Sequence, residues 1–274
     1  MSSSSSSWCA GAIPWPSPAE VATSLNIAVA GAGIGGTVGQ KFAKEGYHAV
    51  LCRRSDEEGL NKLVDAIKAD GDEATGFLMN AIEENAIEDR VAEIEKSIGP
   101  IEVVIYNLGA QIGDRALADT SYRAFEMGWR LATQGLFRLA KAVCPIMEER
   151  GGGKILVTSA TAAVRGNRGQ HSHAAAMGGR RMLCQSLNAE FAPKGIHIAH
   201  ILVDGAVDAP DTLGKMLGDE LFQKLRDTRG AEDGLLQPEH MAETYFHIAH
   251  QHRSTWTHEL DLRSFSDVAW WNHV

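Results

Sequence analysis

The most informative stretch for the fold reads Leu25-Asn26-Ile27-Ala28-Val29-Ala30-Gly31-Ala32-Gly33-Ile34-Gly35-Gly36. Its first half is apolar and predicts a buried strand over residues 26–30. The glycines follow directly, and Val38 and Phe42 then mark one face of a helix. In such a strand–turn–helix unit, backbone N–H groups can approach a pyrophosphate at the helix N-terminus. The stretch therefore predicts a nucleotide site, and the alternative is a glycine-rich turn that holds no ligand.

The same alternation of strand and helix continues along the chain. Further strands are predicted at residues 47–52, 74–79, 101–107, 154–158, 196–203 and 258–263. Amphipathic helices are predicted around 60–67 and 87–98, and longer helices at 122–147, 172–191, 212–226 and 238–250. Strands that alternate with helices predict a parallel sheet covered on both faces. The fold class is therefore α/β, a Rossmann-type doubly wound parallel sheet in a single domain.

Length and composition set the domain boundaries. The chain has 274 residues, of which 44% are hydrophobic, enough for one large α/β domain over residues 25–265. Residues 1–24 are rich in serine and proline, so we expect a flexible extension there. This extension has neither the basic nor the apolar region of a secretory signal. Residues 266–274 are expected to form a C-terminal tail.

Charge and cysteine usage exclude several functions. A net charge of −9 disfavours binding to nucleic acid or to anionic membranes. No segment approaches the ~20 consecutive apolar residues of a membrane span. The four cysteines are widely spaced, which argues against a disulfide framework or a zinc site. We therefore expect a cytoplasmic protein that binds no metal.

The end of the second predicted strand indicates which nucleotide would bind. It reads Leu51-Cys52-Arg53-Arg54, with two cations where a carboxylate would hydrogen-bond the ribose of NAD. Arginine pairs well with phosphate, so Arg53 and Arg54 favour the 2′-phosphate of NADP. The alternative is that both arginines are solvated loop charges.

Three stretches together resemble a known family. They are the glycine turn, Tyr106-Asn107-Leu108-Gly109-Ala110 after the fourth strand, and Val203-Asp204-Gly205 after the sixth. In this order they are similar to the nucleotide turn, the Asn-Asn-Ala-Gly motif and the Pro-Gly of the short-chain dehydrogenase/reductase family. The resemblance covers about residues 25–265, and residues 256–263 also resemble a divergent subgroup with an incomplete glycine motif and no catalytic tyrosine.

The resemblance implies a cofactor, a substrate class and an assembly. The cofactor would be NADP, and the partners would be a small-molecule substrate and further copies of the chain. The helices at 122–147 and 172–191 would pack across a two-fold axis. The implied cofactor-binding residues are Gly31, Gly33, Ile34, Gly35, Arg53, Arg54, Asn80, Asn107 and Gly109. The glycine turn is one residue shorter than the usual loop of the family.

The same resemblance places replaced residues at all four catalytic positions. The asparagine of the family falls on Ala132 and its serine on Ala160. The tyrosine and lysine fall on His173 and Met177, and the threonine after the Pro-Gly falls on Ala209. Alanine cannot donate a hydrogen bond from its side chain, and a thioether cannot supply the positive charge of the lysine. Because acid–base help is typically worth ~10²–10⁴-fold, such a site should be slow at unactivated ketones.

His173 is the candidate replacement for the proton donor. Imidazole titrates near neutrality and could donate a proton where the tyrosine would. Ser159 and Thr161 flank the lost serine, and either could bring a hydroxyl into the pocket. The alternative is that His173 is a helix cap or a surface residue.

Three functional hypotheses follow. The leading one is an NADP(H)-binding oxidoreductase that acts on a small carbonyl or hydroxyl compound with a rebuilt proton donor. The second is a non-redox enzyme on the same fold, an isomerase, a dehydratase or a cyclisation catalyst. The third is a non-catalytic protein that binds a nucleotide or serves as a scaffold.

Overall fold

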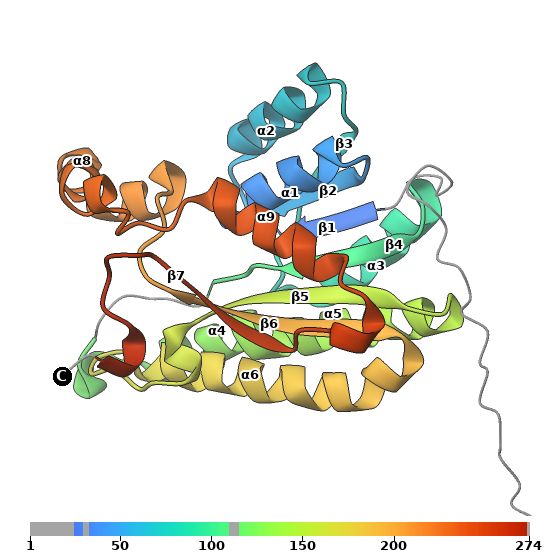
Figure 1. Ribbon diagram of the computed structural model, residues 1–274. Helices are drawn as coiled ribbons and strands as arrows, with labels where there is room; N and C mark the ends of the chain where they lie inside the picture. Colours follow the sequence, from blue (N-terminus) through green and yellow to red (C-terminus); the bar gives the residue numbers. More distant parts are fainter. Residues whose placement is uncertain (1–24, 30–32, 110–114, 273–274) are drawn as a thin grey trace, which may run out of the picture.

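The computed structural model of the protein describes residues 25–29, 33–109 and 115–272 (Figure 1). Its described strands form one sheet in the order β3-β2-β1-β4-β5-β6-β7, and every neighbouring pair is parallel. The strands are β1 (Leu25–Val29), β2 (His48–Arg53), β3 (Ala74–Leu78), β4 (Ile101–Tyr106), β5 (Gly153–Ala160), β6 (Ile196–Asp204) and β7 (Glu259–Arg263). The predicted Rossmann-type parallel sheet is confirmed.

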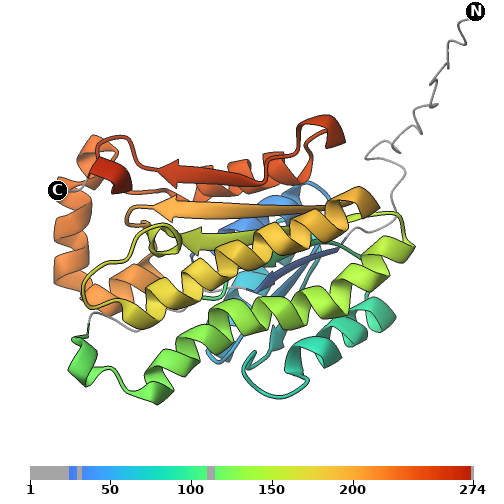
Figure 2. The same cartoon turned by 90° about the horizontal axis from the view of Figure 1, so that it is seen from below.

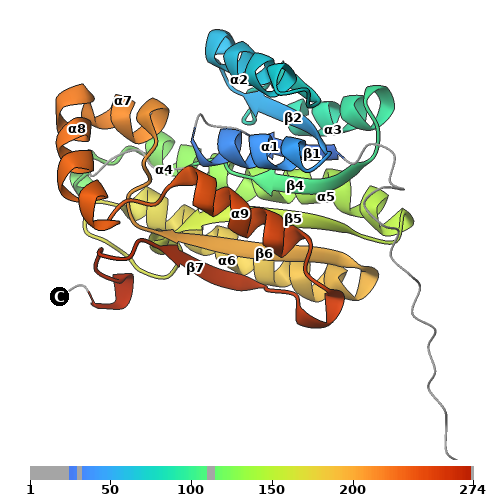
Figure 3. The same ribbon diagram turned by 45° about the horizontal axis from the view of Figure 1, so that its top comes forward.

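Helices cover the sheet on both faces. One face carries α1 (Ile34–Lys44), α2 (Glu57–Ala69) and α9 (Pro238–Ala249), as Figure 3 shows. The other face carries α3 (Ala86–Ser97), α5 (Gly135–Glu149) and α6 (His171–Phe191), which Figure 2 shows in front of the strands. Each layer has its own apolar core, one around Phe42 and Tyr245 and the other around Val143 and Cys184. Burial of these apolar side chains holds the helices on the sheet.

The helix predicted at 122–147 is continuous but not uniform. It consists of α4 (Tyr122–Trp129), a π-helical segment at Arg130–Gln134, and α5. A π-helical segment widens the turn and redirects the backbone carbonyls, and such segments are frequent at functional sites. Here the segment includes Ala132, the residue on which the family resemblance places the asparagine.

The single helix predicted at 212–226 is wrong. The chain instead forms a π-helical turn at Pro210–Gly214, then α7 (Lys215–Leu217) and α8 (Asp219–Thr228). The break falls at Gly218, whose φ of 82° is incompatible with a continuing right-handed helix. These short elements lie at the carboxyl ends of the strands (Figures 2 and 3).

Topology fixes where a ligand can bind. β1 pairs with β2 on one side and with β4 on the other, so the strand order reverses beside β1. Ligands of open α/β sheets bind outside the carboxyl ends of the strands at this point. The last described residues also return to that end, because the Trp270 N–H donates to Asp204 and the Arg165 guanidinium donates to the Trp270 carbonyl.

Candidate functional site

The nucleotide end begins where α1 begins. Gly33 precedes the first turn of α1, and its carbonyl accepts a hydrogen bond from the Thr37 N–H. Of the predicted cofactor residues, Ile34 and Gly35 lie in that first turn, whereas Gly31 lies outside the described residues. The segment after β6 lies against this turn, because a Cβ placed on Gly33 would be 3.2 Å from the Ala209 Cβ. A glycine at position 33 therefore permits the close approach of the two segments.

A cavity of about 650 Å³ extends from this turn. Its walls are the start of α1, the β2–α2 turn, the segment 208–211 with Lys215, and the start of α9. Ligand pockets typically measure ~300–1,000 Å³. The helix N-terminus that it reaches also attracts anions, because the first N–H groups of a helix have no partner within it.

The two arginines that were predicted to bind the 2′-phosphate differ in position. Arg53 lines the cavity and is only 7% exposed, and its Nη1 lies 2.7 Å from the Asp56 carboxylate. Its buried Nε has no hydrogen-bond partner among the residues that the structure describes. Arg54 is exposed and does not line the cavity. Arg53 is thus a cation inside the site, whereas Arg54 is a surface charge beside it.

The ends of β3 and β4 carry the remaining predicted cofactor residues. Asn80 donates from Nδ2 to Glu83 at 2.8 Å, and its buried Oδ1 accepts no hydrogen bond from any described residue. Asn107 is partly buried, and Gly109 is exposed with open space around it. A partnerless acceptor at a strand end is a group that a ligand N–H can satisfy.

Together these residues fit a nicotinamide dinucleotide. The α1 N-terminus suits a pyrophosphate and the Arg53 guanidinium suits a further phosphate.

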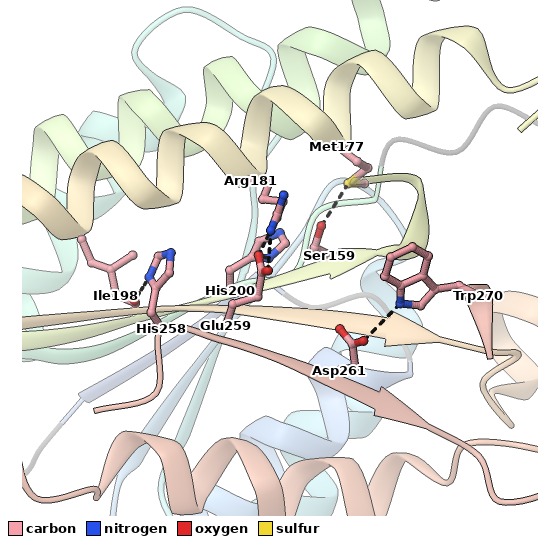
Figure 4. Close-up of polar contacts among 9 residues, drawn as sticks. All are labelled: Ser159, Met177, Arg181, Ile198, His200, His258, Glu259, Asp261 and Trp270. Atoms are coloured by element: carbon pink, nitrogen blue, oxygen red, sulfur yellow. Dashed lines mark hydrogen bonds and ion pairs between the residues drawn. The ribbon is translucent and has the colours of Figure 1, made fainter. Parts of the chain in front are cut away.

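The catalytic end is apolar where the resemblance expects acid–base groups. Ala132, Ala162, Ala176 and Met177 form one buried cluster. The Ser159 hydroxyl donates to the Met177 sulfur at 3.8 Å, a contact that Figure 4 shows between β5 and α6. Sulfur is a weak acceptor. The structure therefore brings Ser159 to Met177, the residue on which the resemblance places the lysine, and the thioether there carries no charge.

His173 lies on the buried side of α6, one helical turn before Met177. It is 7% exposed, so the alternative that it is a surface residue is wrong. The preceding Ser172 hydroxyl is within hydrogen-bond distance of the Ala124 and Phe125 carbonyls, which fixes the start of α6 against α4. Thr161 opens the 3₁₀ turn after β5 and is partly buried.

Arg180 is the residue that sequence reasoning missed. Its guanidinium is 1% exposed and donates to three backbone carbonyls: Ala132 at 3.0 Å, Thr158 at 2.6 Å and Leu108 at 2.6 Å. These bonds join the π-helical segment, β5 and the end of β4. Burial lowers the pKa of the Arg180 guanidinium from its ordinary value.

The position of Arg180 affects the Ala132 carbonyl, and the sequence contained a signal for it. The Arg180 Nε–H donates to the Ala132 carbonyl. The resemblance places at residue 132 the asparagine that holds a relay water in the family. A sequence signal existed, because Arg180 follows His173 and Met177 on the same face of the predicted helix, at i+7 and i+3. A cation on the buried face of a helix needs hydrogen-bond acceptors or anions around it, because an unpaired buried charge is costly.

The histidines near β6 and β7 have structural partners. His200 Nδ1 lies 3.0 Å from Glu259, which also receives two hydrogen bonds from Arg181 (Figure 4). Burial lowers the pKa of His200 to about 4, so its imidazole is neutral at pH 7. His258 bonds to the Ile198 carbonyl, and His197 stacks on a tryptophan. Within residues 25–29, 33–109 and 115–272, no group of three potential metal ligands comes together.

Comparison with known proteins identifies the class. The sequence model of a family described as short chain dehydrogenase matches residues 25–213. The chain therefore belongs to the short-chain dehydrogenase family, and the resemblance stated above is confirmed at that level.

Individual relatives are distant. The chain is 28% identical over 200 residues to the short-chain reductase protein NovJ of Streptomyces niveus, covering 73% of this chain and 72% of that protein. It is 25% identical over 205 residues to the uncharacterized oxidoreductase YxbG of Bacillus subtilis, covering 75% and 70%. A short-chain dehydrogenase structure from Rhodopseudomonas palustris aligns with a TM-score of 0.73 at 28% identity, covering 91% and 100%.

None of the helices in the described part of the chain has the length and apolar character needed to cross a bilayer.

Proposed function

We propose that the protein binds NADP(H) at the reversal of strand order and acts as an oxidoreductase on a small carbonyl or hydroxyl compound. The observation that carries the proposal is the cavity that joins the α1 N-terminus to the buried Arg53. NADPH, when bound, supplies the hydride for the substrate carbonyl carbon. The residues of this chain must then hold the dinucleotide, orient the substrate and deliver the proton.

Similar solved structures support a nicotinamide cofactor. A gluconate 5-dehydrogenase of Burkholderia cenocepacia was solved with NADP, an L-sorbose reductase of Gluconobacter frateurii with NADPH, and an actinorhodin polyketide ketoreductase with NADPH. A 7α-hydroxysteroid dehydrogenase was solved with NADH. For this chain, the choice of NADP(H) is supported by Arg53.

His173 is the proposed proton donor. It lies on the buried face of α6 where the resemblance expects the tyrosine, and an imidazole can donate a proton near neutral pH. Ser159 and Thr161, at the end of β5 and just after it, are the proposed hydroxyl donors to the substrate oxygen. The Ser159–Met177 contact is weak, so the serine hydroxyl can exchange it for a substrate oxygen.

Arg180 favours a second candidate function. Because the Arg180 guanidinium donates to the Ala132 carbonyl, one of the two lone pairs of that oxygen is not available to a relay water. A protein with this arrangement can bind the nucleotide without transferring a hydride, as a non-redox enzyme or a nucleotide-binding scaffold. The two candidates differ in turnover and agree in nucleotide binding.

We further propose a cytoplasmic homo-oligomer. Phe125, Trp129, Phe137 and Met182 are all more than 40% exposed on α4, α5 and α6, the helices expected to pack across a two-fold axis. The cysteines of the described residues are buried free thiols, which suits a reducing compartment. Light scattering tests the assembly, and a mass of 29.6 kDa at micromolar concentration would refute it.

The test of the proposed function has two stages. Purified protein is titrated with NADPH and NADH by calorimetry, and a panel of small carbonyl compounds is then assayed by the loss of NADPH absorbance. The proposal predicts NADPH binding and turnover of at least one carbonyl class. Binding without turnover favours the second candidate, and the absence of binding contradicts both.

A further inference from the structure

The turn between β2 and α2 carries its own anion beside Arg53. Asp56 Oδ2 lies 2.7 Å from Arg53 Nη1, and Asp56 Oδ1 accepts a hydrogen bond from the Gly59 N–H at 3.1 Å. Both Arg53 and Asp56 line the cavity. The carboxylate of Asp56 therefore pairs with the buried Arg53 guanidinium, at the position where a 2′-phosphate would need it.

The backbone of this turn is adapted to the pair. Asp56 has φ 69° and ψ 58°, a left-handed conformation that aspartate tolerates better than most residues. A Cβ added to Gly59 would collide with the Arg53 guanidinium and with the Asp56 carboxylate. The pair thus depends on an uncommon backbone conformation at one residue and on the missing side chain of another.

The other ion pair along this wall is different. Glu58 and Lys62 lie 2.7 Å apart, but their side chains are 81% and 74% exposed. Exposed pairs of this type contribute little, because water and salt screen them. Arg53 is 7% exposed and Asp56 is 47% exposed, so this pair joins a buried cation to a carboxylate at the cavity surface, where an incoming phosphate meets it.

A second cation, from the opposite wall of the cavity, acts on the same carboxylate through its charge and makes no direct contact with it. The pKa of Asp56 is lowered, first by the Gly59 N–H and further by the charges of Arg53 and Lys215. Lys215 belongs to α7, in the segment that follows β6, and its Nζ lies 3.2 Å from Asp211. Two cations from separate segments therefore act on one carboxylate at this corner of the cavity.

We propose that Asp56 is a specificity-determining residue that competes with the 2′-phosphate of NADP(H) for the Arg53 guanidinium. This inference rests on the proposed function. NADP(H) brings a second anion to a guanidinium that already pairs with a carboxylate, whereas NAD(H) carries a hydroxyl at that position and leaves the Arg53–Asp56 pair intact. Asp56 therefore reduces the preference for NADP(H) that Arg53 alone would give.

The decisive variant is Asp56→Asn, measured by calorimetry with NADPH and NADH on the full chain. Asparagine can still accept from the Gly59 N–H and tolerates the left-handed backbone, so the start of α2 is retained while the charge is removed. The NADPH dissociation constant should fall by about tenfold, since the phosphate no longer shares the Arg53 guanidinium with a carboxylate. NADH binding should change by less than about threefold, because its 2′-hydroxyl displaces no charged pair.

The matched control is Glu58→Gln, which removes a carboxylate from the same cavity wall without touching Arg53. It should leave both affinities within about threefold. In an Arg53→Ala background, Asp56→Asn should give no gain, because the group for which the two anions compete is absent.

The outcomes separate this inference from the proposed function. If the unaltered protein binds NADPH and Asp56→Asn leaves the NADPH-to-NADH ratio unchanged, the inference is overturned while the proposed function stands. If only Asp56→Asn binds NADPH, the inference is supported. An equal gain in Glu58→Gln would show a general charge effect and overturn it. If no variant binds either nucleotide, both fail together.

Discussion

The two ends of the site differ in the groups that they offer to a ligand. At the nucleotide end, the α1 N-terminus and the buried Arg53 line one cavity and suit a dinucleotide. At the proton-transfer end, alanines and a methionine form an apolar cluster, and Arg180 occupies the Ala132 carbonyl. The difference indicates that binding and acid–base chemistry in this fold depend on separate sets of residues, which can change independently.

The largest expected effect concerns the buried cation at the proton-transfer end. Arg180→Met should lower the free energy of unfolding by about 4 kcal/mol, because three buried carbonyls lose their donor. Urea unfolding measures this change. Arg181→Met is the control: Arg181 is 32% exposed, and losing its pair with Glu259 should cost about 1 kcal/mol or less. Equal losses in the two variants would show that Arg180 does not organise this end.

His200 makes the stability of the fold depend on pH. Its pKa is about 4 in the folded protein, against 6.5 ordinarily, because burial disfavours the imidazolium. Between these values the unfolded chain binds more protons, so the free energy of unfolding decreases as the pH falls from about 6.5 to about 4. The loss should be roughly 3 kcal/mol for this group. Urea midpoints at several pH values should show a flatter profile for His200→Gln, and an identical slope in both proteins would refute the assignment.

The chemistry of the proton-transfer end is tested at His173. His173→Ala should reduce turnover by ~10²-fold or more, with NADPH affinity within a few-fold, if the imidazole donates the proton. Steady-state kinetics on a substrate found in the carbonyl panel gives the first value and calorimetry the second. Unchanged turnover in His173→Ala would remove the imidazole from the mechanism.

Restoring the tyrosine and the lysine of the family is a second test of the proton-transfer end. His173→Tyr combined with Met177→Lys should raise turnover above that of the unaltered protein if the pocket is otherwise intact. The gain should be limited, because Ala132 and Ala160 still donate nothing. A single His173→Tyr variant is the control, because it lacks the lysine that lowers the pKa of the tyrosine.

The sequence predicted the strands and most helices because their signals are local. Apolar runs such as Val103–Tyr106 and the glycines after β1 depend only on neighbouring residues. The break at Gly218 was missed, since an isolated glycine is also tolerated inside a helix. The Asp56–Arg53 pair depends on the conformation of one turn, and the Arg180 bonds depend on carbonyls up to 72 residues away. The sequence shows the charges at these positions but not the partners that the folded chain gives them.

The most direct test of the account is the calorimetric comparison of Arg53→Ala and Arg54→Ala with NADPH and NADH. NADPH should bind the unaltered protein more tightly than NADH does. Arg53→Ala should weaken NADPH binding by about tenfold and leave NADH binding unchanged, because Arg53 lines the cavity. Arg54→Ala should have the smaller effect, since Arg54 is exposed and outside the cavity lining. Equal affinities for the two cofactors, unmoved by either substitution, would contradict the claim that the nucleotide end is retained for NADP(H).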